Sequence, residues 1–298
     1  MTETVALREP AGLDVAGVEG ASDRQFRRLV AGDWLLPGSV PGLLSFTPKF
    51  EAALARLQAT LTATAPGGSP GPAWHAPVVP RVDIDRAEYA ESFPHLLGVV
   101  YAHDPDAAAG APVPADVVLA PAVCYSVYAR LANQVIAQPR EFDVAGYCYR
   151  HEATSEVGRF RSFRMREFVT VGSADSAWQW RDSWIPRTEA LLRRFGLACT
   201  VERASDPFFG PGGRFMRSSQ VQQNLKYEFV VPVYDGDPGT AIASANGHKD
   251  HLGQRFGIGF AGEVAHSSCM AFGLERTVLA LVHAHGDDPA NWPDLSAG

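Results

Sequence analysis

Two polar, alternating runs flank a short loop in residues 149–167, and this pattern predicts two strands joined by a turn. The loop, residues 153–158, is made of small and polar side chains and ends on Gly158. We expect the complete hairpin to cover residues 141–171. It is the feature around which the rest of the chain can be interpreted.

Apolar residues at helical spacing predict helices on both sides of this hairpin. The segment FEAALARLQATL, residues 50–61, follows Thr47, a residue type that caps helices, and Pro48, which suits a first helical position. A second helix, residues 175–195, contains Pro186, which predicts a kink or a break. Further helices are expected over residues 83–97, 124–136 and 274–283, strands over 77–80, 117–119, 198–202, 227–233 and 240–244, and a turn over 206–210. This order predicts an α+β fold with a mostly antiparallel sheet flanked by helices.

The composition permits one large domain or two small ones, since the 298 residues are 46% hydrophobic. We predict a single domain over residues 23–298. Residues 1–22 carry few large apolar side chains, and we expect a flexible N-terminal segment there.

Charge and apolar runs exclude two classes of protein. A net charge of -7 argues against a domain that wraps nucleic acid. The longest apolar run, residues 117–136, is interrupted by Arg130, Asn133 and Gln134, so it is too polar to cross a bilayer. The first residues lack the features of a signal peptide, and the four cysteines form no C-x-x-C pair. We therefore expect a soluble, cytoplasmic protein.

The predicted hairpin carries an unusual set of side chains. Because side chains alternate between the faces of a strand, Arg150 and Glu152 are expected to point the same way. Arg159, Phe163 and Glu167 follow at intervals of four residues and are expected to share a face of the returning strand. Guanidiniums bind phosphates and an aromatic ring stacks on a base, so this set is typical of a nucleoside triphosphate site. The alternative is a solvated hairpin with charges paired across its strands.

The spacing R-x-E, loop, R-x-x-x-F-x-x-x-E resembles motif 2 of the class II aminoacyl-tRNA synthetases. The resemblance implies that Arg150 holds the α-phosphate of ATP, that Glu152 reads the adenine and that Phe163 stacks on it. It further implies that Arg159 reaches the γ-phosphate, and it places Phe160 in the same ATP site.

A second segment near the C-terminus, Ala271 to Arg276 followed by TVLALVHA, resembles motif 3 of the same family, G-x-G-x-x-R on a strand-to-helix turn. Ala271 stands where the motif has its first glycine. We expect Gly273 to allow a close backbone approach and Arg276 to point toward the γ-phosphate. The alternative is an ordinary buried helix that happens to carry one arginine.

Three residues match the zinc ligands of two more closely defined groups, the archaeal-type seryl-tRNA synthetases and the amino acid:[carrier protein] ligases. These residues are Cys124, Glu167 and Cys269. The resemblance implies a zinc ion with one open position for the amine of an amino acid, so that Cys124 and Glu167 also contact the substrate. The alternative is that each cysteine is a small core residue, as we expect for Cys148 and Cys199.

The resemblance to the ligases covers residues 35–293 and implies further contacts. Glu228 is expected near ATP and its magnesium ion, and Ala243, Ser244 and Asn246 are expected to line the substrate pocket. Seryl-tRNA synthetases place a second metal-binding glutamate where this chain has Ala241, so the resemblance leaves open how magnesium is held.

Together these features predict an ATP-dependent ligase. It would activate a small amino acid, glycine or alanine, as an aminoacyl adenylate, with Arg150 and Arg276 in the catalytic roles. The aminoacyl group would then pass to the phosphopantetheine thiol of a carrier protein. A helix and strand over residues 47–80 resemble motif 1, which implies a homodimer. The alternatives are an enzyme that charges tRNA, disfavoured by the lack of a basic appendage, and a non-catalytic paralogue.

Overall fold

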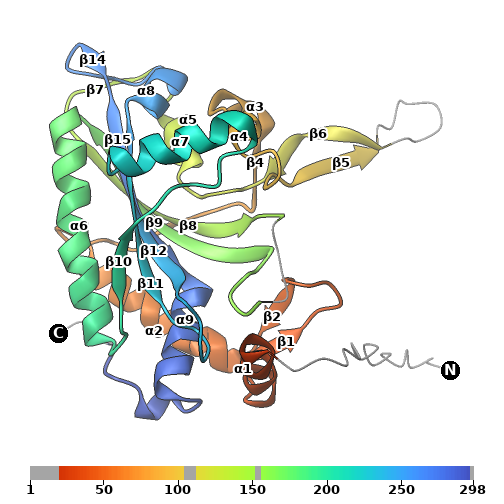
Figure 1. The fold of residues 1–298 in the computed structure, drawn as a ribbon. Helices are drawn as coiled ribbons and strands as arrows, with labels where there is room; N and C mark the ends of the chain where they lie inside the picture. The colour runs from red at the N-terminus through yellow and green to blue at the C-terminus, as the bar shows by residue number, and fades with distance from the viewer. Residues whose placement is uncertain (1–19, 104–111, 152–155, 296–298) are drawn as a thin grey trace.

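The computed structural model describes residues 20–103, 112–151 and 156–295 and has a seven-stranded sheet at its centre (Figure 1). The strand order is β10-β11-β12-β15-β9-β8-β3, and neighbouring strands are antiparallel except for β8 and β3. The strands are β3 (Ala73–His75), β8 (Arg140–Tyr149), β9 (Ser162–Gly172), β10 (Thr200–Arg203), β11 (Lys226–Val231), β12 (Thr240–Lys249) and β15 (His266–Gly273). The predicted α+β class with a mostly antiparallel sheet is confirmed.

Three helices cover one face of this sheet, namely α2 (Pro48–Thr64), α6 (Ala174–Arg194) and α9 (Leu274–His285). Alternate residues of β9 point toward them. Arg166 donates to Thr62 Oγ1 of α2 at 2.8 Å, and the ring of Phe168 lies 4.7 Å from that of Trp184 on α6. The intervening residues of β9, Phe163 and Met165, face the opposite side, where a cavity opens. The period of two along β9 therefore separates the core face from the cavity face.

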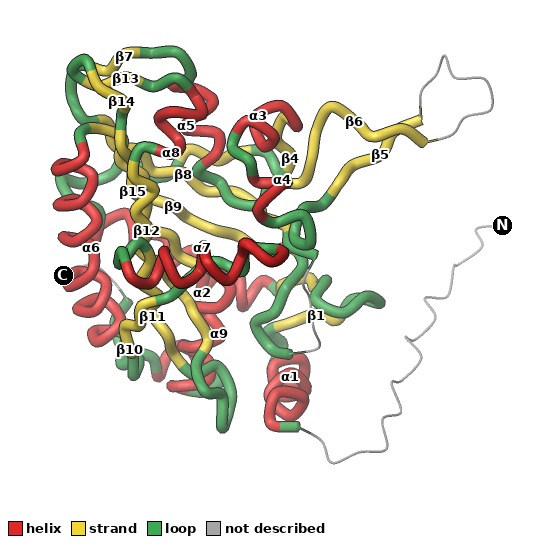
Figure 2. Tube along the Cα trace, turned by 45° about the horizontal axis from the view of Figure 1, so that its top comes forward, coloured by secondary structure: helices red, strands yellow, loops and turns green. Residues whose placement is uncertain are grey.

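Smaller sheets surround the centre. Two of them are β1 (Leu35–Pro37) with β2 (Leu44–Phe46), and β4 (Val78–Pro80) with β6 (Pro112–Leu119) and β5 (Val99–His103). The third joins β7 (Val135–Ile136), β13 (Gly259–Phe260) and β14 (Glu263–Val264). Strands β5 and β6 extend away from the body of the molecule (Figure 2). The remaining helices are α1 (Ala21–Ala31), α3 (Arg81–Arg86), α4 (Tyr89–Ser92), α5 (Tyr125–Leu131), α7 (Gly210–Gln222), α8 (His251–Phe256) and the 3-10 helix η1 (Pro289–Asn291).

The hairpin and the capped helix form as predicted. Strands β8 and β9 pair from Arg140 opposite Val171 to Tyr149 opposite Ser162. Helix α2 has Thr47 as its N-cap, with the side chain accepting from the Phe50 amide at 3.3 Å, and Pro48 in its first turn. None of the described helices is long and apolar enough to span a bilayer.

One expected helix is shorter than predicted, a break at Pro186 is absent, and one helix was not predicted. Helix α5 ends at Leu131, well before residue 136, because Ala132 turns extended and Asn133 adopts a positive φ of 60°. Helix α6 runs through Pro186 without a break, and the buried Trp184 and Thr188 show that packing around the proline outweighs its lost hydrogen bond. Helix α7 was not predicted, because its opening GPGG resembles a turn.

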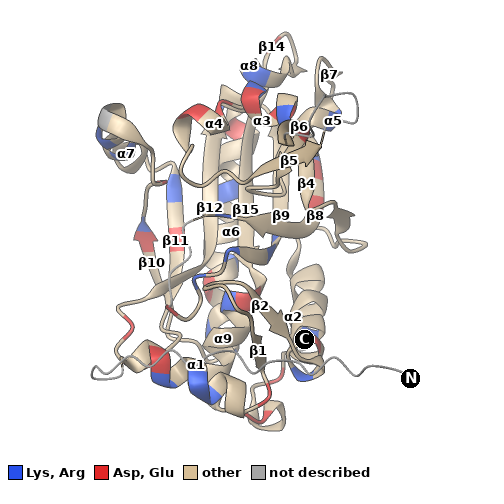
Figure 3. Ribbon diagram, turned by 90° about the vertical axis from the view of Figure 1, so that its right-hand side faces the viewer, with Lys and Arg blue, Asp and Glu red and all other residues tan. Residues whose placement is uncertain are grey.

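Acidic and basic residues are interspersed over the elements that face the viewer in Figure 3, as the modest net charge suggests. The described part of the chain buries a few of these charges in pairs. Arg164 on β9 donates to Glu275 Oε1 at 2.6 Å and to Glu51 Oε2 at 2.7 Å. The side chain of Glu275 is only 1% exposed, so its charge depends on this guanidinium. Through these two ion pairs, Arg164 joins the sheet to α9 and to α2 directly beneath the cavity.

Replacing Arg164 with methionine is expected to lower the free energy of unfolding by about 3–5 kcal/mol, because the carboxylate of Glu275 would stay buried without its partner. Urea denaturation followed by circular dichroism measures the change. Arg28→Met is the matched control, since the Arg28–Asp287 pair is exposed and worth about 1 kcal/mol at most. Equal losses in the two variants would contradict the prediction.

Candidate functional site

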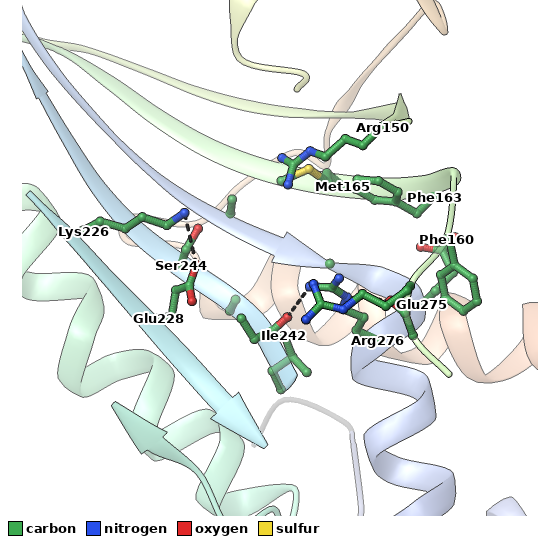
Figure 4. Close-up of a pocket in the computed structure, with 16 residues that line it drawn as sticks. Arg150, Phe160, Phe163, Met165, Lys226, Glu228, Ile242, Ser244, Glu275 and Arg276 are labelled. Carbon is green, nitrogen blue, oxygen red and sulfur yellow. Dashed lines mark hydrogen bonds and ion pairs between the residues drawn. The ribbon is translucent and has the colours of Figure 1, made fainter. Parts of the chain in front are cut away.

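A cavity open to solvent lies against the sheet face opposite α2, α6 and α9 (Figure 4). Its empty space, counted together with the open solvent in its mouth, is about 750 Å³. It gathers residues from the end of β8, the segment before β9, β9 itself, β11, β12, β15 and the start of α9. Most of the predicted ATP-site residues line it. Those residues are Arg150, Arg159, Phe160, Phe163, Glu228 and Arg276, joined by Ala243 and Ser244 from the predicted substrate pocket.

The hairpin places its aromatic ring and its first arginine together. Strand β8 ends at Tyr149, and Arg150 follows, with its amide donating to the Arg161 carbonyl at 2.9 Å. The Arg150 guanidinium lies 5.5 Å from the centre of the Phe163 ring, which projects from β9. A cation above an aromatic face, both bordering one cavity, is a suitable surface for a phosphorylated base.

Two of the predicted ATP-site residues, Arg159 and Phe160, lie in the loop before β9. Arg159 does not lie on the returning strand, because β9 begins at Ser162; it borders the cavity from the preceding loop and pairs with Glu156 at 3.4 Å. Phe160, in the same loop, is buried with its ring 6.1 Å from that of Phe46. The predicted adenine-reading residue, Glu152, lies outside the described residues.

The predicted strand-to-helix turn is present at the opposite wall. Strand β15 ends at Gly273 and α9 begins at Leu274, which puts Arg276 in the first turn. Arg276 donates to the Gly158 carbonyl at 2.8 Å and to the Ala241 carbonyl at 2.9 Å, so it ties the hairpin loop to β12. Within the protein, a Cβ at Gly273 would meet the Ile242 carbonyl oxygen at 3.5 Å, an ordinary contact distance. The close backbone approach expected at Gly273 stays a prediction.

Strands β11 and β12 form the third wall. Glu228 and Ser244 are directly opposed in their register, and both line the cavity. Lys226, two residues before Glu228 and on the same face, also lines it and bonds to Glu228 Oε1 at 3.1 Å. The sequence analysis assigned Lys226 no role. The period of two from Glu228 is the signal that could have found it.

The predicted cysteines and carboxylate come together beside this cavity. The Cys124 thiol hydrogen-bonds to Cys269 and to Glu167, and all three residues are buried. Glu167 Oε1 accepts from the Val123 amide at 2.7 Å. Asn246, also a predicted pocket residue, donates to Cys269 Sγ at 3.4 Å and to Ser244 Oγ at 3.1 Å, which links the cluster to the cavity wall.

A histidine that the sequence analysis had not singled out completes the cluster. His248 Nε2 lies 3.6 Å from Cys269 Sγ, while its Nδ1 is held by Tyr128 Oη at 3.0 Å and Ser267 Oγ at 3.1 Å. His248 follows Ser244 and Asn246 at intervals of two along β12, so alternation puts it on their face. Its proximity to Cys269 could not be predicted without knowing the register in which β12 pairs with β15.

The buried cluster shifts the pKa values of its members strongly. The hydrogen bond with Cys269, followed by burial, raises the pKa of the Cys124 thiol well above its usual range. The hydrogen bond from Cys124 and the charge of His248 hold the pKa of Cys269 well below its usual range despite burial. Burial and the neighbouring Cys269 raise the pKa of Glu167 to about 7. Of the two thiols, Cys269 is therefore the one that loses its proton more readily, and the thiolate is the form that binds metal ions.

The chemistry of this donor set fits zinc, which prefers thiolate, imidazole and carboxylate ligands in buried sites. As they stand, no three His, Cys, Asp or Glu side chains within residues 20–103, 112–151 and 156–295 are arranged to hold a metal ion. The donors of the cluster instead hydrogen-bond to one another. The predicted trio of Cys124, Glu167 and Cys269 is nevertheless assembled in one place.

Comparison with known proteins now places the chain in a family. Residues 115–285 match the model of the tRNA synthetase class II core domain (G, H, P, S and T). The chain is 42% identical over 235 residues to amino acid--[acyl-carrier-protein] ligase 2 of Bradyrhizobium diazoefficiens, covering 73% of this chain and 70% of that protein. Ligase 1 of the same organism is 37% identical over 270 residues, which cover 85% of this chain and 82% of that protein.

The chain belongs to the amino acid–[acyl-carrier-protein] ligase family. It is accordingly an ATP-dependent ligase built on a class II synthetase core, as the two motifs predicted.

Solved structures agree on the fold of this ligase. The Methanopyrus kandleri seryl-tRNA synthetase, in its complex with Aquifex aeolicus tRNASec, superposes with a TM-score of 0.74 at 20% identity. The superposition covers 97% of this chain and 61% of the synthetase chain, so the ligase spans about three fifths of its length. Seryl-tRNA synthetase from Pyrococcus horikoshii complexed with ATP gives a TM-score of 0.64 at 15% identity, over 88% of this chain and 58% of that one.

Proposed function

We propose that this ligase activates a small amino acid, glycine or alanine, with ATP and transfers it to the phosphopantetheine thiol of a carrier protein. One observation carries the proposal. Arg150, Phe163 and Arg276 come from three separate elements to border one cavity, and a buried cluster of Cys124, Glu167 and Cys269 lies beside it. The names of the two Bradyrhizobium relatives support an amino acid and an acyl carrier protein as substrates.

In the first step a carboxylate oxygen of the amino acid forms a bond to the α-phosphorus of ATP, and the bond to pyrophosphate breaks. The products are an aminoacyl adenylate and pyrophosphate. Arg150 would bind the α-phosphate, where charge develops, and Arg276 and Arg159 would orient the departing pyrophosphate. Phe163 would stack on the adenine, and Glu152 would accept from its amino group.

In the second step the thiol of the carrier protein attacks the carbonyl carbon of the adenylate. A thioester forms, AMP leaves, and the thiol proton is lost. A phosphate oxygen of the adenylate is the acceptor we propose for this proton.

We propose two metal ions for the site. Cys124, Glu167 and Cys269 would hold zinc, which when bound supplies a position that binds the substrate amine and so selects free α-amino acids. Glu228 lies on the cavity wall where it would face the magnesium of ATP, with Ser244 opposite it. Ala243 and Asn246, on the same strand as Ser244, would complete the substrate pocket.

Amino-acid-dependent exchange between ATP and labelled pyrophosphate tests the first step. With a panel of the twenty amino acids, we expect exchange with glycine or alanine and little with larger residues. A profile dominated by serine or by a large residue would contradict the assignment of a small substrate. Absence of exchange with every amino acid would instead favour a non-catalytic paralogue.

Thioester formation on a carrier protein tests the second step. It also distinguishes the proposed function from a second candidate, the charging of tRNA. The chain is 30% identical over 188 residues to the type-2 serine–tRNA ligase of Methanococcus aeolicus, which covers 36% of that protein. This likeness favours tRNA charging as the alternative. We expect aminoacylation of a phosphopantetheinylated carrier protein and none of tRNA, and tRNA charging at comparable rates would contradict our proposal.

We also propose a homodimer, from the resemblance of residues 47–80 to motif 1. Mass measurement by light scattering of the purified ligase distinguishes one chain from two.

A further inference from the structure

A largely buried lysine lines the cavity. Lys226 is the first residue of β11, its side chain is 12% exposed, and its Nζ atom points along the wall that also carries Glu228 and Ser244 (Figure 4). Lysine is scarce in this protein, since Lys49 and Lys249 are its only others. A buried ammonium requires partners to offset the loss of its hydration.

Lys226 has two carboxylate partners that belong to different parts of the site. Its Nζ atom lies 3.1 Å from Glu228 Oε1, which faces the nucleotide end of the cavity under the proposed function. It also lies 2.5 Å from Asp206 Oδ1, in the segment that joins β10 to α7. One ammonium thus bridges a strand of the sheet and a connecting segment outside it.

Asp206 is in turn fastened to α7. Its amide donates to Gln220 Oε1 at 2.6 Å, and its Oδ2 accepts from Gln220 Nε2 at 2.8 Å. The contacts Lys226–Asp206 and Asp206–Gln220 therefore form a continuous chain from the cavity wall to α7. Helix α7 lies across the strands in Figure 2. Its C-terminal end is also contacted by Lys249 of β12, which bonds to the C-cap residue Gln223. Of these two lysines, only Lys226 lines the cavity.

The charges around this chain favour the ionised pair. Burial alone would raise the pKa of Asp206, but Lys226, with a contribution from Arg150, holds that pKa below its usual range. Burial likewise opposes the charge of Lys226, and Asp206 and Glu228 together raise its pKa above its usual range. Asp206 and Lys226 are both charged near neutral pH as a result.

We propose that Lys226 is a positioning residue that orients Glu228 toward the nucleotide and, through Asp206 and Gln220, fixes α7 beside the cavity. The first half of this role rests on the proposed function, because it assumes that ATP occupies the cavity. The second half concerns the fold alone. A lysine that served only stability would leave the ATP kinetics of the folded enzyme unchanged, although it would alter hydrogen exchange.

The test compares four variants of the full chain. Lys226→Met removes the charge and keeps the aliphatic stem, Lys226→Arg keeps the charge, and Gln220→Ala cuts the chain at α7 only. Lys49→Met is the matched control, since Lys49 lies on α2, outside the cavity lining, and donates to the Gly32 carbonyl at 2.8 Å. Hydrogen exchange of the peptide over residues 210–222 reports on α7, and pyrophosphate exchange at varied ATP reports on the nucleotide end.

We expect Lys226→Met to lower kcat/KM for ATP on the order of a hundredfold, as misplaced catalytic geometry does. We also expect it to speed hydrogen exchange in α7 about tenfold. Lys226→Arg should recover kcat/KM for ATP to within about tenfold of the wild type and hydrogen exchange in α7 to within about threefold. Gln220→Ala should speed exchange in α7 while leaving ATP kinetics within about threefold, and Lys49→Met should alter neither.

Unchanged hydrogen exchange of α7 in Lys226→Met would overturn the proposal, whatever the enzyme activity. Unchanged ATP kinetics in this variant, with an active wild type, would overturn it as well. If the wild type exchanges no pyrophosphate with any amino acid, the proposed function fails, and the α7 readout still decides the placement role. Should Lys226→Met not fold, as judged by circular dichroism, Lys226→Gln carries the same two readouts.

Discussion

Replacement of Arg150 by alanine is expected to reduce amino-acid-dependent pyrophosphate exchange roughly a thousandfold, because a preorganised cation at developing phosphoryl charge is worth about 10²–10³ in rate. The structure places its guanidinium on the cavity wall, 5.5 Å from the Phe163 ring and opposite Arg276. Such a group needs no reorganisation during the reaction. Its loss is therefore expected to appear in kcat as well as in KM for ATP.

The control for this prediction is Arg140→Ala, at the opposite end of β8. Arg140 is an exposed arginine of the same strand that lies away from the cavity, so exchange is expected to stay within about threefold of the wild type. Arg150→Lys should recover only part of the lost activity, since an ammonium lacks the planar fork of the guanidinium. Full activity of Arg150→Ala would mean that the cavity does not hold the reacting phosphates.

Replacement of Cys269 by serine is expected to lower the zinc content of the purified ligase from about one ion per chain to nearly none, because a hydroxyl is a far poorer zinc ligand than a thiolate. The two side chains are close in size, so the buried site between Asn246 and His248 should keep its packing. Pyrophosphate exchange should fall at least a hundredfold with the metal. Inductively coupled plasma mass spectrometry measures the zinc directly.

Cys199→Ser serves as the matched control, because Cys199 is only half-buried and lies on the approach to β10, outside the cluster. It should retain wild-type zinc content and activity. Zinc-free wild-type enzyme with full activity would refute the assignment of the cluster as a metal site. Full zinc content in Cys269→Ser would refute the role of this thiol as a ligand.

Local patterns predicted much of the fold, since they depend on residues that are neighbours in the chain. The alternation around Phe163 placed the hairpin correctly, and Thr47 and Pro48 located the start of α2. Local rules failed where packing opposed them. Pro186 did not break α6, because the helix is held on both sides of it by buried residues, and the GPGG segment began a helix instead of continuing the turn.

The candidate site could be predicted only to the extent that its residues belong to recognisable patterns. Phe163 and Arg276 carry spacings that can be read along the chain, and both border the cavity. Lys226 and His248 belong to neither motif, although each follows the alternation of predicted residues on its strand. Their importance comes from Asp206 and Cys269, whose positions relative to them depend on strand register and on a connecting segment.

The sequence by itself determined most of the elements of this ligase, its two motifs and its resemblance to the family. The tertiary structure decided which distant residues meet. Cys124 meets Cys269 because α5 packs beside the sheet, and Lys226 meets Asp206 because the segment before α7 folds back onto β11. The physical reason is that periodicity records the burial of one element at a time, whereas contacts between elements depend on packing and register over the whole chain.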